Sequence, residues 1–88
     1  MIDNSEIPLT IHVRNREGIL FEGTILSLTG INQKGTFDIL SLHSNFVTLV
    51  EQKIVLKTPE GKVEEIEVKS GVLRVIENHI EVYLGFLN

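Results

Sequence analysis

Cysteine, alanine and tryptophan are absent from the 88 residues, and there is a single methionine. Without cysteine the chain has no thiol nucleophile, no thiolate metal ligand and no disulfide scaffold. Isoleucine, valine and threonine are abundant instead, and their branched Cβ atoms suit a pleated, half-buried strand better than a helix. The composition therefore predicts an all-β fold, and we expect residues 1–88 to form one domain with its own core.

The chain also lacks a basic stripe and a long apolar run. Its net charge is −4, and its eight lysines and arginines are scattered, which argues against nucleic acid and anionic membrane surfaces as partners. No apolar stretch reaches the roughly 18–20 residues of a spanning helix, so we expect no direct membrane insertion. The segment 1–8 is acidic and lacks the pattern of a signal peptide.

Alternating apolar residues, separated by turn residues, fill most of the chain. Leu9, Ile11 and Val13 share one strand face, and Ile80, Val82, Leu84 and Phe86 share another. We expect strands at 9–13, 19–29, 36–40, 46–50, 53–58, 62–68, 72–76 and 80–86, with 1–7 as a loose tail. Short strands with a turn signal every few residues are typical of an antiparallel sandwich or barrel.

The sequence shows no pattern typical of catalysis. His12, His43 and His79 are far apart and form no HxH or HExxH motif, so we expect no metal site. Glu65 and Glu67 share a strand face and could act as an acid–base pair, but we expect a solvated outer face. There is no nucleophile elbow and no phosphate-binding loop. We therefore expect no catalytic residue and no cofactor.

Three stretches match the motifs of one known family. In residues 35–50, the family pattern G-x-[LI]-G-[IV]-x-P-G-H-A-P-L corresponds to Gly35, Phe37, Ile39, His43 and Phe46. Residues 70–84 read S-G-V-L-R-V-I-E-N-H-I-E-V-Y-L, against the family's G-G-[IVF]-L-x-V-x-x-x-x-V-x-V-L. L-F-E-G at 20–23 is similar to the family's [ML]-[FY]-x-G. Together these stretches resemble the N-terminal β-sandwich domain of the epsilon subunit of F-type ATP synthases.

The chain departs from the family pattern in several places. Asp38 stands where the family usually has glycine, Ser41-Leu42 replaces Pro-Gly before the histidine, and Ser44-Asn45 replaces Ala-Pro after it. The family's C-terminal helical hairpin is absent, which we interpret as a naturally short subunit or a cut at a domain boundary. Inhibition of ATP hydrolysis and ATP binding belong largely to that hairpin, so neither is carried over.

The resemblance implies an antiparallel β-sandwich of two packed sheets, and with the strand count we expect about 8–10 short strands. It also implies a non-catalytic role. The epsilon subunit lies at the foot of the rotating central stalk, against the gamma subunit and the ring of c subunits, and supports proton-driven ATP synthesis. The expected location is cytoplasmic, peripheral on the inner face of the membrane through the ATP synthase complex. We expect a monomer in isolation, although two copies could pair in a crystal.

Two segments are assigned to partners by the resemblance alone. The first faces gamma and comprises Leu42, His43, Ser44, Asn45 and Phe46. The second faces the c ring and comprises Lys34, Gly35 and Thr36. The alternative for His43 is a turn histidine that hydrogen-bonds local backbone and touches no partner.

Two other functions stay open at this stage. One is a free-standing β-sandwich module that binds another protein and has lost the stalk role; a smooth polar surface would favour it. The other is a small enzyme or ligand-binding barrel, which needs a deep pocket with convergent polar groups. The stalk role predicts an exposed apolar patch of several hundred Å² or more, because stable interfaces bury roughly 800 Å² on each partner.

Overall fold

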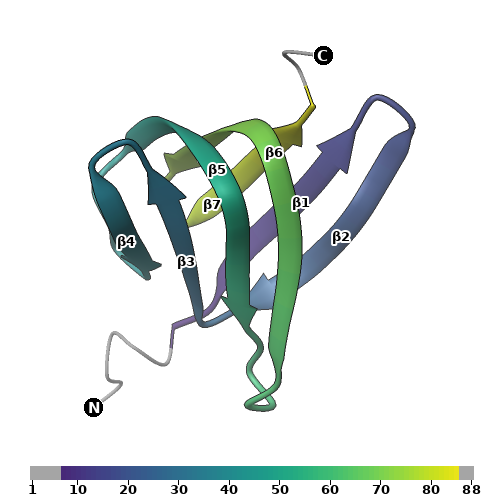
Figure 1. The fold of residues 1–88 in the computed structure, drawn as a ribbon. Helices are drawn as coiled ribbons and strands as arrows, with labels where there is room; N and C mark the ends of the chain where they lie inside the picture. The colour runs from purple at the N-terminus through teal and green to yellow at the C-terminus, as the bar shows by residue number, and fades with distance from the viewer. Residues whose placement is uncertain (1–6, 86–88) are drawn as a thin grey trace.

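The computed structural model describes residues 7–85, and strands make up most of this part of the chain (Figure 1). The strands are β1 (Leu9–Asn15), β2 (Gly18–Ile25), β3 (Ser27–Asn32), β4 (Gly35–Leu40), β5 (Phe46–Lys57), β6 (Val63–Ile76) and β7 (His79–Leu84). The predicted all-β class is confirmed. Within residues 7–85 no helix is long and apolar enough to cross a membrane. Residues 1–6 of the predicted tail, and Phe86 of the last predicted strand, lie outside the described residues.

All seven strands belong to one hydrogen-bonded sheet, in the order β2-β1-β7-β6-β5-β3-β4. β1 and β7 run parallel, with His12 opposite Glu81, and the other neighbouring strands are antiparallel. The prediction of a purely antiparallel fold was therefore wrong. Tight turns force the β1–β2 and β6–β7 hairpins to be antiparallel, but no turn joins β1 to β7, so their direction is set by how the two hairpins pack.

The strands are fewer and longer than predicted, because two of the predicted breaks between strands are bends within a strand. β5 continues through a register shift between Val50 and Gln52, where Gln52 has a φ of 69°. β6 continues through Gly71, which packs closely against Val50 and Leu84. A bulge bends a strand without ending its pairing, so four predicted short strands become two long ones. In the other direction, the predicted segment 19–29 divides at Leu26 into β2 and β3.

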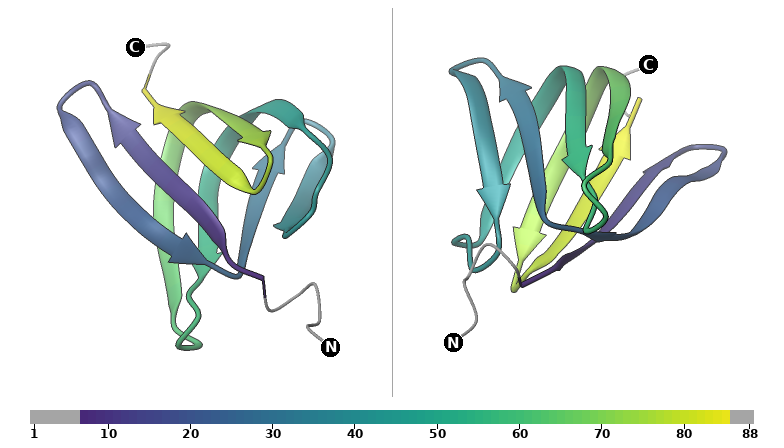
Figure 2. Two further views of the ribbon diagram at one scale, coloured as in Figure 1. Left: turned by 180° about the vertical axis from the view of Figure 1, so that it is seen from behind. Right: turned by 90° about the horizontal axis from the view of Figure 1, so that it is seen from below.

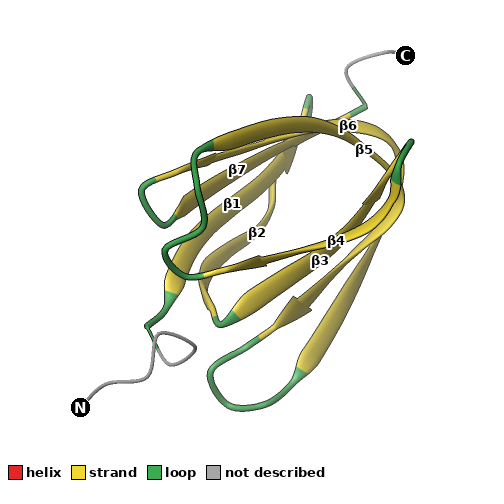
Figure 3. Cartoon of the chain, turned by 90° about the vertical axis from the view of Figure 1, so that its left-hand side faces the viewer, coloured by secondary structure: helices red, strands yellow, loops and turns green. Residues whose placement is uncertain are grey.

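The bends in β5 and β6 divide the sheet into two halves that face each other (Figures 1 and 3). The β3–β4 half contains β4, β3, residues 53–57 of β5 and residues 63–68 of β6. The β1–β7 half contains residues 46–50 of β5, residues 71–76 of β6, and β7, β1 and β2. Seen from behind, β7, β1 and β2 lie nearest to the viewer, in front of β3 and β4 (Figure 2, left).

One apolar core fills the space between the halves. The alternation predicted for β1 and β7 is confirmed within the described residues, because Ile11 and Val82 are fully buried. The core comprises Leu9, Ile11, Val13, Ile25, Leu28, Ile39, Val50, Ile54, Leu56, Val68, Leu73, Val75, Ile80, Val82 and Leu84. Phe21, Phe37, Phe46 and Ile66 pack against it. Side chains that point away from this core form the two outer faces of the folded sheet. The two predicted partner segments lie at opposite ends of β4, and the other candidate groups lie on the outer face of the β1–β7 half.

Candidate functional site

The segment predicted to face gamma forms the loop from β4 into the start of β5. Its backbone is held against the β6–β7 turn. The Leu42 N–H donates to the Asn78 side-chain oxygen at 2.6 Å, and the Asn45 side-chain oxygen accepts from the Glu77 N–H at 3.2 Å. These bonds tie the loop to a turn more than thirty residues away in the sequence. The structure therefore brings this segment together as one fixed surface element, with the Leu42 side chain exposed.

His43 makes local contacts within that loop. Its Nδ1 lies 2.7 Å from the Ser44 carbonyl oxygen, and its N–H donates to the Leu40 carbonyl at 3.2 Å. Its ring lies edge to face on Phe46, with centroids 5.5 Å apart. This is the local bonding expected of a turn histidine. His43 is half-buried.

The segment predicted to face the c ring is the exposed tip of the β3–β4 hairpin. The Lys34 N–H donates to the Asn32 side-chain oxygen at 2.8 Å, which closes the turn. Gly35 has a φ of +121°, a backbone conformation that favours glycine. The two predicted segments are not brought together. They lie at opposite ends of β4, whose six residues span about 17 Å.

An apolar surface that the sequence analysis did not locate follows directly after the first segment. Val47 and Leu49 point outward from β5, and Leu49 pairs with Val72 of β6. Ile76 is exposed further along β6. We call Val47, Leu49, Val72 and Ile76 the β5–β6 apolar face. The alternation of Phe46 to Val50 was visible in the sequence, but which of its two faces points outward depends on the fold.

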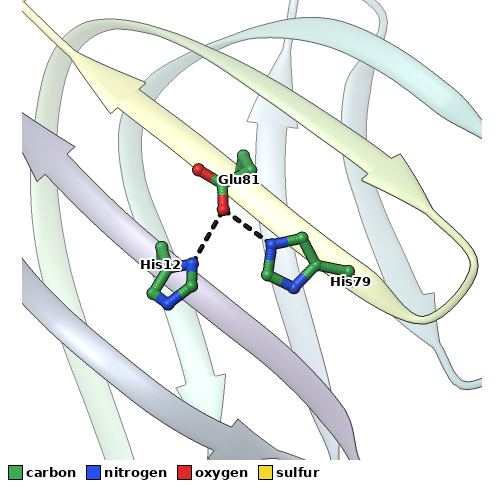
Figure 4. A group of neighbouring side chains, drawn as sticks. All are labelled: His12, His79 and Glu81. Atoms are coloured by element: carbon green, nitrogen blue, oxygen red, sulfur yellow. Dashed lines mark hydrogen bonds and ion pairs between the residues drawn. The ribbon is translucent and has the colours of Figure 1, made fainter.

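Two histidines and a glutamate meet on the outer face of β1 and β7 (Figure 4). One oxygen of Glu81, Oε2, lies 2.8 Å from Nδ1 of His12 and 2.7 Å from Nε2 of His79. We call these three residues the His–Glu cluster. It could hold a metal ion, because each residue offers one ligand atom and the three atoms lie within 4.8 Å of one another. No metal site was expected from the sequence, although the spacing His79-x-Glu81 puts both side chains on one strand face.

The charge of Glu81 is affected by both burial and its histidine partners. Partial burial raises the pKa of Glu81, while the hydrogen bonds from His12 and His79 lower it, and the net effect is a pKa below the ordinary value of 4.5. Two further side chains surround the cluster. Glu22 lies 3.3 Å from Nε2 of His12, and the Thr10 hydroxyl lies 2.6 Å from Nδ1 of His79. Hydrogen bonds to the ionised carboxyl are the physical reason that it stays charged.

The sequence of this chain is similar to the sequences of one protein family. Residues 8–84 match the family model described as the ATP synthase, Delta/Epsilon chain, beta-sandwich domain. The ATP synthase epsilon chain of Nitratiruptor sp. is 30% identical over 71 residues, which cover 80% of this chain and 55% of the relative. That of Sulfurimonas denitrificans is 28% identical over 75 residues, covering 84% and 58%. The chain thus spans little more than half the length of these relatives.

Solved structures show the same fold at low sequence identity. A chain in the mitochondrial ATP synthase of Euglena gracilis (OSCP/F1/c-ring) superposes with a TM-score of 0.82 at 11% identity, covering 96% of this chain and 52% of that one. A chain in the central stalk and c-ring structure of the Tetrahymena thermophila mitochondrial enzyme gives 0.71 at 8% identity, covering 85% and 61%. At these identities the likeness establishes the fold.

Proposed function

The chain belongs to the ATP synthase delta/epsilon-chain β-sandwich family, and from this membership we propose that it is a non-catalytic rotor subunit of an F-type ATP synthase. In this role it links gamma to the c ring and supports proton-driven ATP synthesis. The observation that carries the proposal is the family match over residues 8–84, which includes all seven strands. The proposed location follows from the complex: cytoplasmic, and peripheral on the inner face of the membrane.

The proposed subunit is a single β-sandwich domain. The β3–β4 half and the β1–β7 half would correspond to the two packed sheets of the family's sandwich. The support is that buried residues from both halves, such as Leu56 and Leu73, belong to the same core cluster. β5 and β6 then act as long strands shared between the two layers, which keeps all seven strands in one hydrogen-bonded sheet.

The proposed gamma-binding surface combines the loop at 42–46 with the β5–β6 apolar face. The two are continuous in the chain, because Phe46 is followed directly by the exposed Val47. Exposed apolar side chains beside a fixed polar loop are the composition of a protein-binding surface. They also favour the stalk role over a free-standing module, for which a smooth polar surface was expected.

The proposed contact with the c ring is the hairpin tip at Lys34, Gly35 and Thr36. All three residues are exposed, and they lie at the end of β4 opposite the loop at 42–46. Two surfaces at opposite ends of β4 would allow the subunit to contact both partners at once. The third hypothesis, an enzyme or a ligand-binding barrel, loses support because apolar side chains fill the interior of the folded sheet.

A matched pair of substitutions tests the gamma surface. Val47 is 63% exposed and Val63 is 65% exposed, on opposite halves of the sheet. Val47→Glu would face Arg74, and Val63→Glu would face Lys57, so each new carboxylate meets a basic residue. Purified gamma is mixed with each variant and analysed by size-exclusion chromatography and calorimetry. We expect Val47→Glu to weaken the 1:1 complex at least tenfold, and Val63→Glu to stay within about twofold of the unsubstituted protein.

The second partner is tested with the same proteins. Lys34→Glu should weaken binding to the detergent-solubilised c ring and leave gamma binding unchanged, while Val47→Glu should do the reverse. If folded gamma and the c ring from the same source both elute separately from the unsubstituted chain, the rotor role is wrong. The free-standing binding module would then be the function to pursue.

A further inference from the structure

The His–Glu cluster borders the β5–β6 apolar face, because His79 pairs with Ile76, but the proposed rotor role assigns the cluster no part. It is built on adjacent strands, because β1 and β7 pair with His12 opposite Glu81 and Thr10 opposite His79. His12 and His79 also lie edge to face, with ring centroids 5.1 Å apart. Figure 4 shows both rings pointing their nitrogens at one oxygen of Glu81. Two imidazoles and a carboxylate are a ligand set that Zn²⁺ takes in proteins.

We propose that His12, His79 and Glu81 form a binding site for a divalent transition metal ion, with Zn²⁺ as the best match. The ligand atoms are Nδ1 of His12, Nε2 of His79 and a carboxylate oxygen of Glu81. Three protein ligands leave a fourth position for water or for a group from outside. The inference does not depend on the rotor role.

The distances fit an ion after a small rotation of side chains. Tetrahedral bonds of about 2.1 Å place neighbouring ligand atoms about 3.4 Å apart. The two histidine-to-Glu81 distances are 2.8 and 2.7 Å, so each contact must widen by roughly 0.6 Å. Rotation about the side-chain torsions can supply that change while the Cα atoms stay where the strand pairing holds them. A proton now lies in each short contact, and a metal ion would take the place of both protons.

The second nitrogen of each ring already has the partner that a metal-bound histidine needs. Nδ1 of His79 lies 2.6 Å from the Thr10 hydroxyl, and Nε2 of His12 lies 3.3 Å from the Glu22 carboxylate. Each ring can donate its N–H to that oxygen and direct a lone pair at the site. Such outer partners fix the tautomer and orientation of histidine ligands. Their presence on both rings distinguishes this cluster from two surface histidines that happen to be neighbours.

Access to the site suits an ion, while the charge around it is mixed. Glu22 and Glu81 supply negative charge, while Arg74, which pairs with Glu81 on β6, and Arg14 in the next row oppose it. The side chains of His12, His79 and Glu81 are 36%, 39% and 23% exposed. Water and ions can therefore reach the ligand atoms without any opening of the sheet. The opposing arginines predict an affinity below that of closed four-ligand zinc sites.

The first test titrates ZnCl₂ into the purified 88-residue protein at neutral pH by isothermal calorimetry. We expect a 1:1 complex. His12→Gln, His79→Gln and Glu81→Gln should each weaken Zn²⁺ binding by more than a hundredfold, and Glu22→Gln by about tenfold. His43→Gln is the matched control, because His43 is also half-buried but lies outside the cluster; its affinity should stay within about twofold.

A second measurement needs no variant and so cannot be confused by misfolding. The imidazole nitrogens are followed by NMR during the Zn²⁺ titration. Nδ1 of His12 and Nε2 of His79 should shift together at one equivalent, with His43 unchanged. Equal shifts of all three histidines, binding that His43→Gln weakens as much as His79→Gln does, or no 1:1 binding at all would overturn the proposal. The cluster would then be a hydrogen-bonded group alone.

Discussion

The two halves of the folded sheet share one core but present different outer faces. The β3–β4 half carries charged side chains on its outside, where Lys53 lies 3.5 Å from Glu65 and the Thr29 hydroxyl donates to Asp38 at 2.5 Å, together with the exposed Leu40 and Val63. The β1–β7 half carries the β5–β6 apolar face and, beside it, the His–Glu cluster. Both halves are built from hydrogen-bonded strands, although only the β1–β7 half contains a parallel pair. The two halves therefore differ in the side chains that point outward, because these side chains do not have to pack in the core.

This contrast bears on where the proposed gamma surface lies. A charged, solvated outer face on strands discourages contact with other sheets, which suits a surface that should remain free. The predicted solvated face of Glu65 and Glu67 is confirmed, because both are exposed. On the opposite half the β5–β6 apolar face gathers exposed apolar side chains on two paired strands, which an isolated domain does not need. The proposed gamma surface and the proposed metal site accordingly lie on the same half.

The largest expected effect tests whether the halves are one folding unit. Leu56 belongs to the β3–β4 half, Leu73 to the β1–β7 half, and both are fully buried in the same core. Leu56→Ala and Leu73→Ala should each lower the free energy of unfolding by about 2–5 kcal/mol, because each leaves a cavity in that core. Urea unfolding followed by circular dichroism should show one transition in both variants. A second transition in either would mean that the halves unfold separately.

The next effect concerns the bend that joins the halves. A Cβ on Gly71 would lie 2.8 Å from Cδ2 of Leu84 and 3.0 Å from the Tyr83 carbonyl oxygen. The backbone oxygen cannot move aside as a side chain can, so Gly71→Ala should cost about 1–3 kcal/mol. The adjacent Ser70→Ala is the control and should stay within about 0.5 kcal/mol. Equal thermal stability of the two variants would show that the bend tolerates a side chain.

A smaller effect distinguishes the outer faces by pH. The pKa of Glu81 is lower in the folded protein than its ordinary value of 4.5, so its ionised form favours folding. That contribution is fully present above about pH 4.5 and is lost as the pH falls through the lower folded pKa. Glu81→Gln should therefore reduce stability near neutral pH, by about 1 kcal/mol or less because water screens the site. The difference from the unsubstituted protein should vanish in acid.

The control for that experiment lies on the other half. Glu65→Gln removes a carboxylate from an exposed pair and should change the pH profile less than Glu81→Gln does. Both variants are measured with a chelator present, so that no metal contributes. If the Glu65 variant shows the larger loss between neutral and acid pH, the assignment of the stabilising carboxylate to Glu81 is wrong.

The smallest effect is expected at Lys53. Its nitrogen lies 3.5 Å from Glu65, and the two side chains are 47% and 57% exposed. Exposed ion pairs contribute little, so Lys53→Gln should alter the unfolding free energy by less than about 0.5 kcal/mol. High salt should remove even that difference, because it screens surface charges. A loss above 1 kcal/mol that persists in high salt would show that Lys53 stabilises the fold through more than an exposed ion pair.

The sequence was informative wherever the determining interactions are local. Alternation identified the inward residues of β1 and β7, and the family motifs identified the fold family, which residues 8–84 confirm. The sequence was less informative about the positions where a strand bends without ending. The breaks in alternation near Gln52 and Gly71 look the same in sequence whether a strand ends or only bends there. Strand number was therefore overestimated.

The candidate sites show the same division. The segments at 34–36 and 42–46 were proposed from motifs within the chain, and their partner contacts stay predictions. The His–Glu cluster was missed. His79 and Glu81 are two residues apart and could have been noticed, but His12 is 69 residues from Glu81. No periodicity in a single sequence reports a contact over that separation.

Sequence alone determined the β class, the shared apolar faces of β1 and β7 and the family, because each follows from the order of side chains along the chain. The tertiary structure decided the rest. It placed β1 parallel to β7, carried β5 and β6 from one half to the other, and so brought His12 to Glu81 and exposed Val47 beside the loop at 42–46. The reason is physical: alternation sets which side of a strand is buried, but packing around the whole core sets which strands become neighbours.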